Sequence, residues 1–115
     1  MLADMHIQIE AARLMLRKAA ASNTKSSSNG NEFPNILEAA QAKIFASEMA
    51  IKVTNDALQI FGSSGYSRNF PLERMARDAR MFTIGGGTAQ ILRTVVASAL
   101  LDEKLPQTRD GYLKK

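Results

Sequence analysis

One stretch of the chain, from Ile36 to Phe61, reads as a single long helix. It contains neither glycine nor proline, is rich in alanine, and is followed by Gly62. As a helix, these twenty-six residues would be about 39 Å long. Its apolar positions lie on two sides, Leu37, Ala40, Ile44, Ile51 and Leu58 on one and Phe45, Met49, Val53, Ala57 and Ile60 on another. Because both sides need cover, the pattern predicts a helix at the centre of a bundle.

Three further stretches show the helical period. The first begins at Leu2, and its apolar rows are Leu2, Met5, Ile9, Ala12, Leu16 and Ala19, then Ile7, Ala11 and Leu14. The second follows Pro71, which is tolerated in a first turn, and carries Leu72, Met75, Ala79 and Phe82. The third follows Thr88, a good N-cap, and its expected buried face is Ile91, Leu92, Val95, Val96, Ala99 and Leu100. No strand-like alternation exceeds four residues, so the predicted class is all-α, an up-and-down four-helix bundle.

We expect residues 1–115 to form one domain. Residues 22–35 are rich in serine and asparagine and are predicted to form a flexible loop, whereas residues 102–115 are predicted to form an extended tail. The apolar pattern starts at Leu2 without an N-cap residue before it. We therefore expect the chain to be a fragment of a longer polypeptide.

Composition removes several classes of function. The chain has no cysteine and a single histidine, His6, so we expect neither a disulfide framework, a thiolate nucleophile nor a metal site. No apolar run reaches the ~18 residues of a membrane span. The net charge of +4 permits an anionic partner. Four arginines lie at positions 68, 74, 77 and 80, but acidic residues interrupt them and no aromatic platform accompanies them. A nucleic-acid interface is therefore not favoured, and Arg77 and Asp78 are interpreted as a structural ion pair.

The stretch from Asp56 to Arg93 carries three motifs in an ordered, ungapped series. They are QIFGSSGY, then FPLERMARDAR, then FTIGGGTAQILR. This series resembles the C-terminal domain of the acyl-CoA dehydrogenases, which carry QIFGGxGY, a proline-led helix ending in RDA, and xxIYEGTxxIQR. The opening LADMHIQIEAARLMLRKAA is similar to the family helix that follows an RxxFGxxxxxxQ element.

The resemblance implies both a fold and an activity. Family members combine a helical domain, a β domain and a C-terminal four-helix bundle, and most are homotetramers. They oxidise an acyl-CoA to the 2-enoyl-CoA, as in fatty acid beta-oxidation. A glutamate removes the α-proton, hydride passes to FAD, and electrons pass to electron-transferring flavoprotein. The implied compartment is a bacterial cytoplasm or a mitochondrial matrix.

Matched position by position, two segments correspond to binding sites. The resemblance implies that one segment holds the AMP half of an FAD across a subunit interface; it comprises Gln59, Ile60, Phe61, Gly62 and Ser63, the last replacing a family glycine. Flavin contacts are implied for Thr88 and Gln90. Contacts with the acyl-CoA substrate are implied for Gly86, Gly87 and Arg93.

The family's catalytic glutamate corresponds to Gly86, which has no proton acceptor. No catalytic base is therefore expected in this chain. One explanation, which we favour at this point, is that an earlier helix, upstream of Met1, carries the base. Isovaleryl-CoA and long-chain dehydrogenases do this, and the isovaleryl type reads close to YEIGAGTSEIRR. The other explanation is that the parent protein has lost dehydrogenation and retains binding. In either case the N–H of Gly86 remains and corresponds to the family's donor to the thioester carbonyl.

The chain itself is expected to be inactive, because the base and the other flavin-binding domains are expected to lie outside it. It is also expected to self-associate, because a missing family helix would leave apolar surface open. An alternative from a different class is a stand-alone, non-catalytic helical interaction module derived from the same family.

Overall fold

The computed structural model describes residues 1–22, 24–25 and 32–105. Its elements are α1 (Leu2–Ala21), β1 (Thr24–Lys25), β2 (Glu32–Phe33), α2 (Ile36–Phe61), α3 (Ser63–Tyr66), α4 (Leu72–Met81) and α5 (Ala89–Leu101). The predicted all-α class is confirmed. Among the described residues the exceptions are the two-residue strands β1 and β2, which pair antiparallel. The long central helix has the bounds that the sequence predicted.

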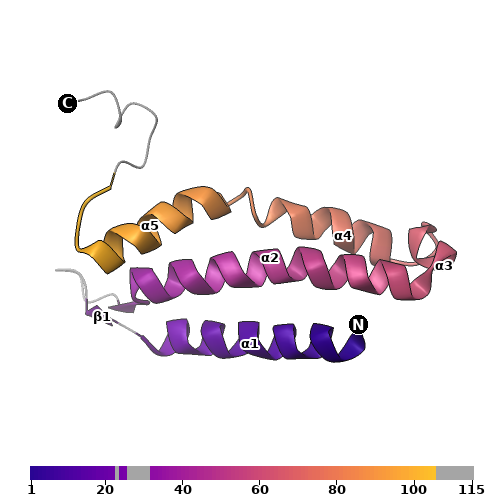
Figure 1. Cartoon of the computed structure of the whole chain (residues 1–115), viewed down its shortest axis with the longest axis horizontal. Helices are drawn as coiled ribbons and strands as arrows, with labels where there is room; N and C mark the ends of the chain where they lie inside the picture. Colours follow the sequence, from indigo (N-terminus) through magenta and orange to yellow (C-terminus); the bar gives the residue numbers. More distant parts are fainter. Residues whose placement is uncertain (23, 26–31, 106–115) are drawn as a thin grey trace, which may run out of the picture.

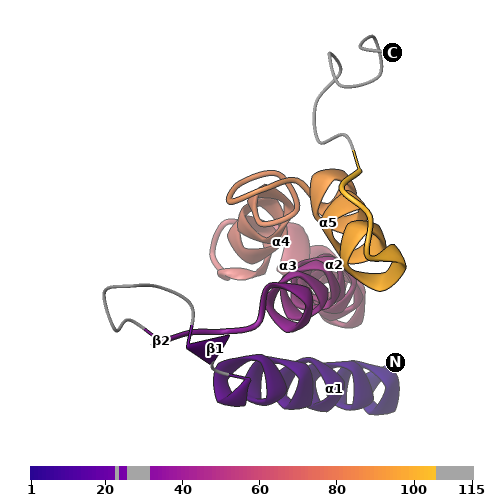
Figure 2. The ribbon, with the colours of Figure 1, turned by 90° about the vertical axis from the view of Figure 1, so that its left-hand side faces the viewer.

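Helix α2 lies in the middle of the molecule, with α1 along one side and α4 and α5 along the other (Figure 1). An end-on view shows the same three levels (Figure 2). In the described part of the chain, α1 packs against α2 alone, while α2 also contacts α3, α4 and α5. Helices α4 and α5 follow one another in the same direction, opposite to that of α2. In the end-on view the two helices are displaced sideways from one another, and each contacts α2 (Figure 2).

Both ends of α2 are set by local backbone chemistry. At the start, Asn35 Oδ1 accepts hydrogen bonds from the N–H groups of Leu37 and Glu38, at 2.9 and 3.4 Å. At the end, Gly62 has a φ of +58° and donates its N–H to the Gln59 carbonyl. This left-handed conformation favours glycine and stops the helix.

The predicted connections fall partly outside the described residues. Of the predicted loop 22–35, residues 23 and 26–31 are not described, and its two ends are joined because the Asn35 N–H donates to the Ser22 carbonyl and hydroxyl. Of the predicted tail, residues 106–115 are not described. Asp102 has a φ of +52°, and the N–H groups of Glu103 and Leu105 donate to Ser98.

The buried apolar residues that the structure describes are all alanines: Ala12, Ala19, Ala40, Ala42, Ala79 and Ala89. Such small side chains let helix backbones approach closely. The predicted burial of larger side chains is wrong at several positions. Leu2 and Leu16 of α1 are 71% and 50% exposed, and Ile91 and Leu100 of α5 are 41% and 67% exposed. The reason is that nothing in the described part of this chain covers the outer faces of α1 and α5.

None of the described helices has the length and hydropathy needed to cross a membrane.

Candidate functional site

The glycine segment between α4 and α5 has an unusual backbone. Gly86 and Gly87 have φ angles of +68° and +89°, in the left-handed region that disfavours side chains. A Cβ atom on Gly87 would lie 3.3 Å from Cδ2 of Leu92, whereas one on Gly86 would meet no atom within 4 Å. On Gly85 a Cβ would lie 3.0 Å from the flexible Met81 side chain. Backbone conformation therefore accounts for two of the three consecutive glycines.

Hydrogen bonds hold the segment at both ends. The N–H of Gly85 donates to the Met81 carbonyl at 2.8 Å, and the N–H of Ala89 donates to the carbonyl of buried Thr83 at 2.9 Å. Thr88 Oγ1 accepts from the N–H of Ile91 at 3.1 Å, which confirms Thr88 as the N-cap of α5. The Thr88 hydroxyl proton has no partner in the described residues and can still be donated to a ligand.

Two side chains of α2 reach this segment from more than forty residues away. Lys43 Nζ donates to the Gly87 carbonyl at 2.6 Å, and Glu48 forms an ion pair with Arg93 at 2.7 Å. Arg93 thus ties α5 to α2, and its substrate contact stays a prediction. Nothing in the sequence singled out Lys43 or Glu48, because their partners lie 44 and 45 positions away.

The N–H groups of Gly86 and Gly87 have no acceptor among the described residues, and both residues are exposed. The adjacent start of α5 carries the partial positive charge of a helix N-terminus. Gln90, in the first turn of α5, is exposed as well. The segment therefore offers backbone donors to a ligand oxygen but no side-chain base at Gly86.

The other predicted segment lies at the far end of α2. Gln59, Ile60, Phe61, Gly62 and Ser63 are all exposed. The Phe61 ring meets the Phe70 ring edge-on, at a centroid distance of 5.9 Å. Phe61 and Phe82 are 50% and 53% exposed.

A surface hollow of about 370 Å³ opens beside this segment. It is lined by Asn55, Leu58, Gln59, Gly62 and Tyr66. A Cβ on Gly62 would meet no atom within 4 Å, so the backbone is open to an approaching group. The hollow thus combines side-chain amides with an open backbone at Gly62, and the predicted AMP-binding role of this segment stays a prediction.

The two segments are not brought together within one chain. Lys43, which marks the glycine segment, and Gln59 are sixteen residues apart on one helix, a separation of about 24 Å. A small ligand cannot touch both ends, so binding at both segments would require either an extended ligand or two different ligands.

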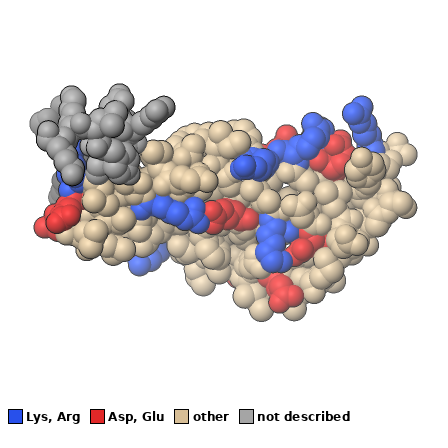
Figure 3. Space-filling model, turned by 45° about the horizontal axis from the view of Figure 1, so that its top comes forward, with Lys and Arg blue, Asp and Glu red and all other residues tan. Residues whose placement is uncertain are grey.

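A second hollow lies beside α3 and α4. It is lined by Tyr66 and Glu73 together with three arginines, Arg68, Arg77 and Arg80. Arg77 pairs with Glu73 at 2.9 Å, not with Asp78 as the sequence was interpreted. The Arg77 hydrogen bond lowers the pKa of Glu73, and the same bond raises the pKa of Arg77. Figure 3 shows basic and acidic side chains lying side by side on this face rather than a continuous basic surface.

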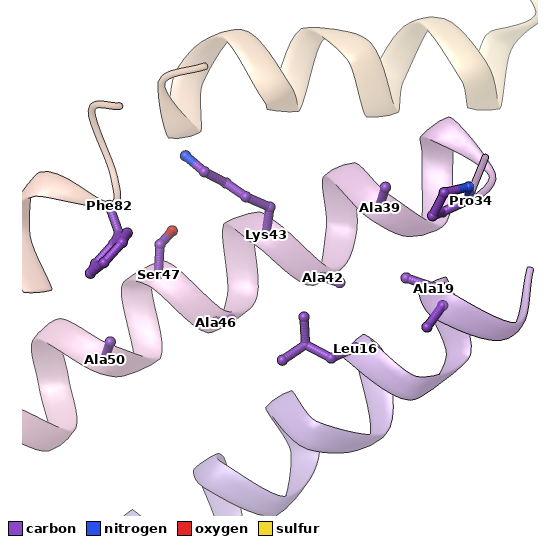
Figure 4. Close-up of a pocket in the computed structure, with 11 residues that line it drawn as sticks. Leu16, Ala19, Pro34, Ala39, Ala42, Lys43, Ala46, Ser47, Ala50 and Phe82 are labelled. Carbon is purple, nitrogen blue, oxygen red and sulfur yellow. The ribbon is translucent and has the colours of Figure 1, made fainter. Parts of the chain in front are cut away.

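An apolar groove of about 460 Å³ runs between α1 and α2, and the sequence did not predict it. Alanines of α2 line it with Leu16, Lys43 and Phe82 (Figure 4). The alanine positions 39, 42, 46 and 50 recur at helical spacing, which was the one visible signal. No group of three His, Cys, Asp or Glu side chains suited to a metal ion occurs within the described ranges.

Residues 1–101 match the family described as acyl-CoA dehydrogenase, C-terminal domain. The chain is 71% identical, over 99% of its length, to a 3-sulfinopropanoyl-CoA desulfinase of Advenella mimigardefordensis, and covers 27% of that protein. It is 48% identical, over 88% of its length, to a probable acyl-CoA dehydrogenase, fadE25, of Mycobacterium bovis, covering 25% of it. The solved butyryl-CoA dehydrogenase of Megasphaera elsdenii superposes with a TM-score of 0.76 at 44% identity, over 87% of this chain and 24% of that one. The chain thus spans about a quarter of the length of these relatives.

Proposed function

Because the chain belongs to the acyl-CoA dehydrogenase family, as a C-terminal domain of that family, we propose that it forms the helical part of an FAD-dependent enzyme that acts on an acyl-CoA thioester. We further propose that this enzyme is a desulfinase of 3-sulfinopropanoyl-CoA. The identity to the protein of that name is 71%, against 48% to the probable dehydrogenase. This proposal replaces the 2-enoyl-CoA-forming reaction as the first choice.

The observation that carries the proposal is the 71% identity to the desulfinase, and the chemistry of Gly86 is compatible with it. Its N–H is free among the described residues, yet the residue has no carboxylate. A backbone donor can polarise a thioester carbonyl, whereas α,β-dehydrogenation also needs a base for the α-proton. A desulfinase does not need net oxidation. Of the two explanations that the sequence left open, the identity to a desulfinase favours the loss of dehydrogenation.

Desulfination can balance without an external electron acceptor. The carbon–sulfur bond breaks, water supplies a hydroxyl to the sulfur and a proton to the carbon, and the products are propanoyl-CoA and hydrogensulfite. The sulfur is oxidised by two electrons and the carbon is reduced by two. When bound, FAD supplies a polarisable, electron-accepting ring beside the acyl chain. In this chain, the Gly86 N–H would hold the thioester carbonyl, Thr88 and Gln90 would hold the flavin, and residues 59–63 would hold the AMP half.

The separation of the two segments supports a homo-oligomer, with the AMP-binding segment serving a flavin in a neighbouring subunit. A tetramer is the arrangement that the resemblance implies. The relatives reported above are bacterial, which supports the bacterial cytoplasm over the mitochondrial matrix.

The test uses the full natural polypeptide, purified with its flavin. With 3-sulfinopropanoyl-CoA we expect one sulfite released per propanoyl-CoA formed, and with propanoyl-CoA or butanoyl-CoA we expect no reduction of a dye acceptor. Dye or electron-transferring flavoprotein reduction by saturated acyl-CoAs, without sulfite release from the sulfinate, would instead establish the dehydrogenase. If the purified protein contains no flavin and shows neither activity, that result would favour the non-catalytic interaction module.

A further inference from the structure

We propose that Lys43 is a positioning residue for the glycine segment 85–87. Its ammonium group binds the Gly87 carbonyl at 2.6 Å. This contact fixes the Gly87–Thr88 peptide group and so limits the backbone conformations open to the Gly86 N–H, two peptide groups earlier. The inference rests on the proposed function in one respect only, namely that the Gly86 N–H receives the thioester carbonyl. The placement of Lys43 itself does not depend on which acyl-CoA reaction follows.

The segment needs an external support because glycine restricts the backbone so little. Gly86 and Gly87 lie consecutively in the left-handed region. The flanking hydrogen bonds end at Gly85 on one side and begin again at Thr88 on the other. Between these points, Lys43 supplies the one hydrogen bond in the described structure that comes from another helix to the segment.

Lys43 is well placed to act as a rigid support. It lies on α2, which is held by α1 on one side and by α4 and α5 on the other. Its methylene groups line the apolar groove beside Ala39, Ala42 and Phe82. Figure 4 shows the side chain extending from this groove toward α5. Apolar packing of the stem with a charged head at its end is how lysine commonly spans such a boundary.

The consequence is a preorganised donor. Lys43 holds the carbonyl of the peptide group that joins Gly87 to Thr88, and the cap on α5 holds Thr88. Fewer conformations then remain for the peptide groups of Gly86 and Gly87. A donor that is already oriented loses less entropy when charge develops on a ligand oxygen. A hydrogen bond with a charged partner is also stronger than a neutral one.

Amide hydrogen exchange of the full natural polypeptide tests the placement without any substrate. In Lys43→Met we expect exchange at Ala89, Ile91 and Leu92, whose N–H groups are bonded within or beside the segment, to rise about tenfold, with α1 unchanged. Lys52→Met is the matched control, because Lys52 lies on the same helix but pairs with Asp56 at 2.6 Å. Lys52→Met should leave amide exchange at Ala89, Ile91 and Leu92 unchanged. Unchanged exchange in Lys43→Met, or an equal rise throughout α1, would overturn the proposal.

Kinetics with 3-sulfinopropanoyl-CoA gives a second measurement. In Lys43→Met we expect kcat for sulfite release to fall about 10- to 100-fold, with a smaller change in KM, because an oriented donor matters most as charge develops. Lys43→Arg keeps a charged donor and should recover most of kcat. If Lys43→Arg is as impaired as Lys43→Met in both measurements, the hydrogen bond is not the role of Lys43. If the parent releases no sulfite, the proposed function fails, while the exchange experiment still decides the positioning role.

Discussion

At the scale of single residues, the three consecutive glycines are not equivalent. Gly85 has no left-handed φ, Gly86 is left-handed with open space around it, and Gly87 is left-handed with Leu92 against it. The family resemblance assigned a role in ligand approach to the segment, and that role stays a prediction. Backbone conformation is a separate reason for glycine, and it applies with or without a ligand.

We therefore expect alanine substitutions to destabilise the protein in the order Gly87, Gly86, Gly85. Gly87→Ala combines a disfavoured φ with a Cβ 3.3 Å from Leu92 and should lower the free energy of unfolding by about 1–3 kcal/mol. Gly86→Ala carries the backbone penalty alone, about 1 kcal/mol. Gly85→Ala meets only the movable Met81 side chain. Urea unfolding followed by far-ultraviolet circular dichroism measures all three, and equal losses would contradict the conformational account.

At the scale of elements, neighbouring charges on a helix need the correct spacing to meet. In α4, Arg77 lies one turn after Glu73 and pairs with it, whereas Asp78, next to it in sequence, points elsewhere around the helix. Residues four apart share a face and adjacent ones do not. The spacing of four between Glu73 and Arg77 is therefore the sequence feature that indicates this ion pair.

This ion pair predicts a small dependence of α4 on pH. Because Arg77 lowers the pKa of Glu73 in the folded protein, the stabilisation is present above the ordinary value of 4.5 and is lost as pH falls through the lower, folded pKa. The pair is solvent-accessible, so the effect on stability should be slight. Nuclear magnetic resonance titration should place the Glu73 pKa below 4.5, and Arg77→Met should raise it. An unchanged Glu73 titration in Arg77→Met would contradict the assignment.

At the scale of the whole molecule, many large apolar side chains are exposed to solvent. Leu2, Ile7, Leu14 and Leu16 of α1 are each at least half exposed, as are Leu100 and Leu101 of α5.

We expect the 115-residue chain on its own to form dimers or larger species at micromolar concentration, because exposed apolar faces of this size commonly become contacts. Ile7 and Leu14 lie two turns apart on α1 and are 64% and 62% exposed. The double substitution Ile7→Glu and Leu14→Glu should shift the chain toward monomer in sedimentation velocity. The control, His6→Glu, adds a charge at a neighbouring exposed position and should leave the sedimentation of the chain unchanged. A parent chain that sediments as a monomer would contradict the expectation.

The sequence by itself determined the features whose causes are local. Helical period and a terminal glycine were sufficient for the bounds of α2, and a side-chain hydroxyl before an apolar row was sufficient for the N-cap Thr88. These signals act over about one turn, so they survive in any packing. The ordered motifs from Asp56 to Arg93 identified the family for the same reason, because they are contiguous.

Only the tertiary structure decided which distant residues meet and which faces are covered. The contact of Lys43 with Gly87 and that of Glu48 with Arg93 depend on how α5 lies on α2, and no spacing in the sequence encodes that angle. Periodicity likewise shows that a helix face is apolar, but burial needs a second surface against it. For Leu16 and Ile91 the described part of the chain provides no complete cover, so residues with the same pattern as a core remain at the surface.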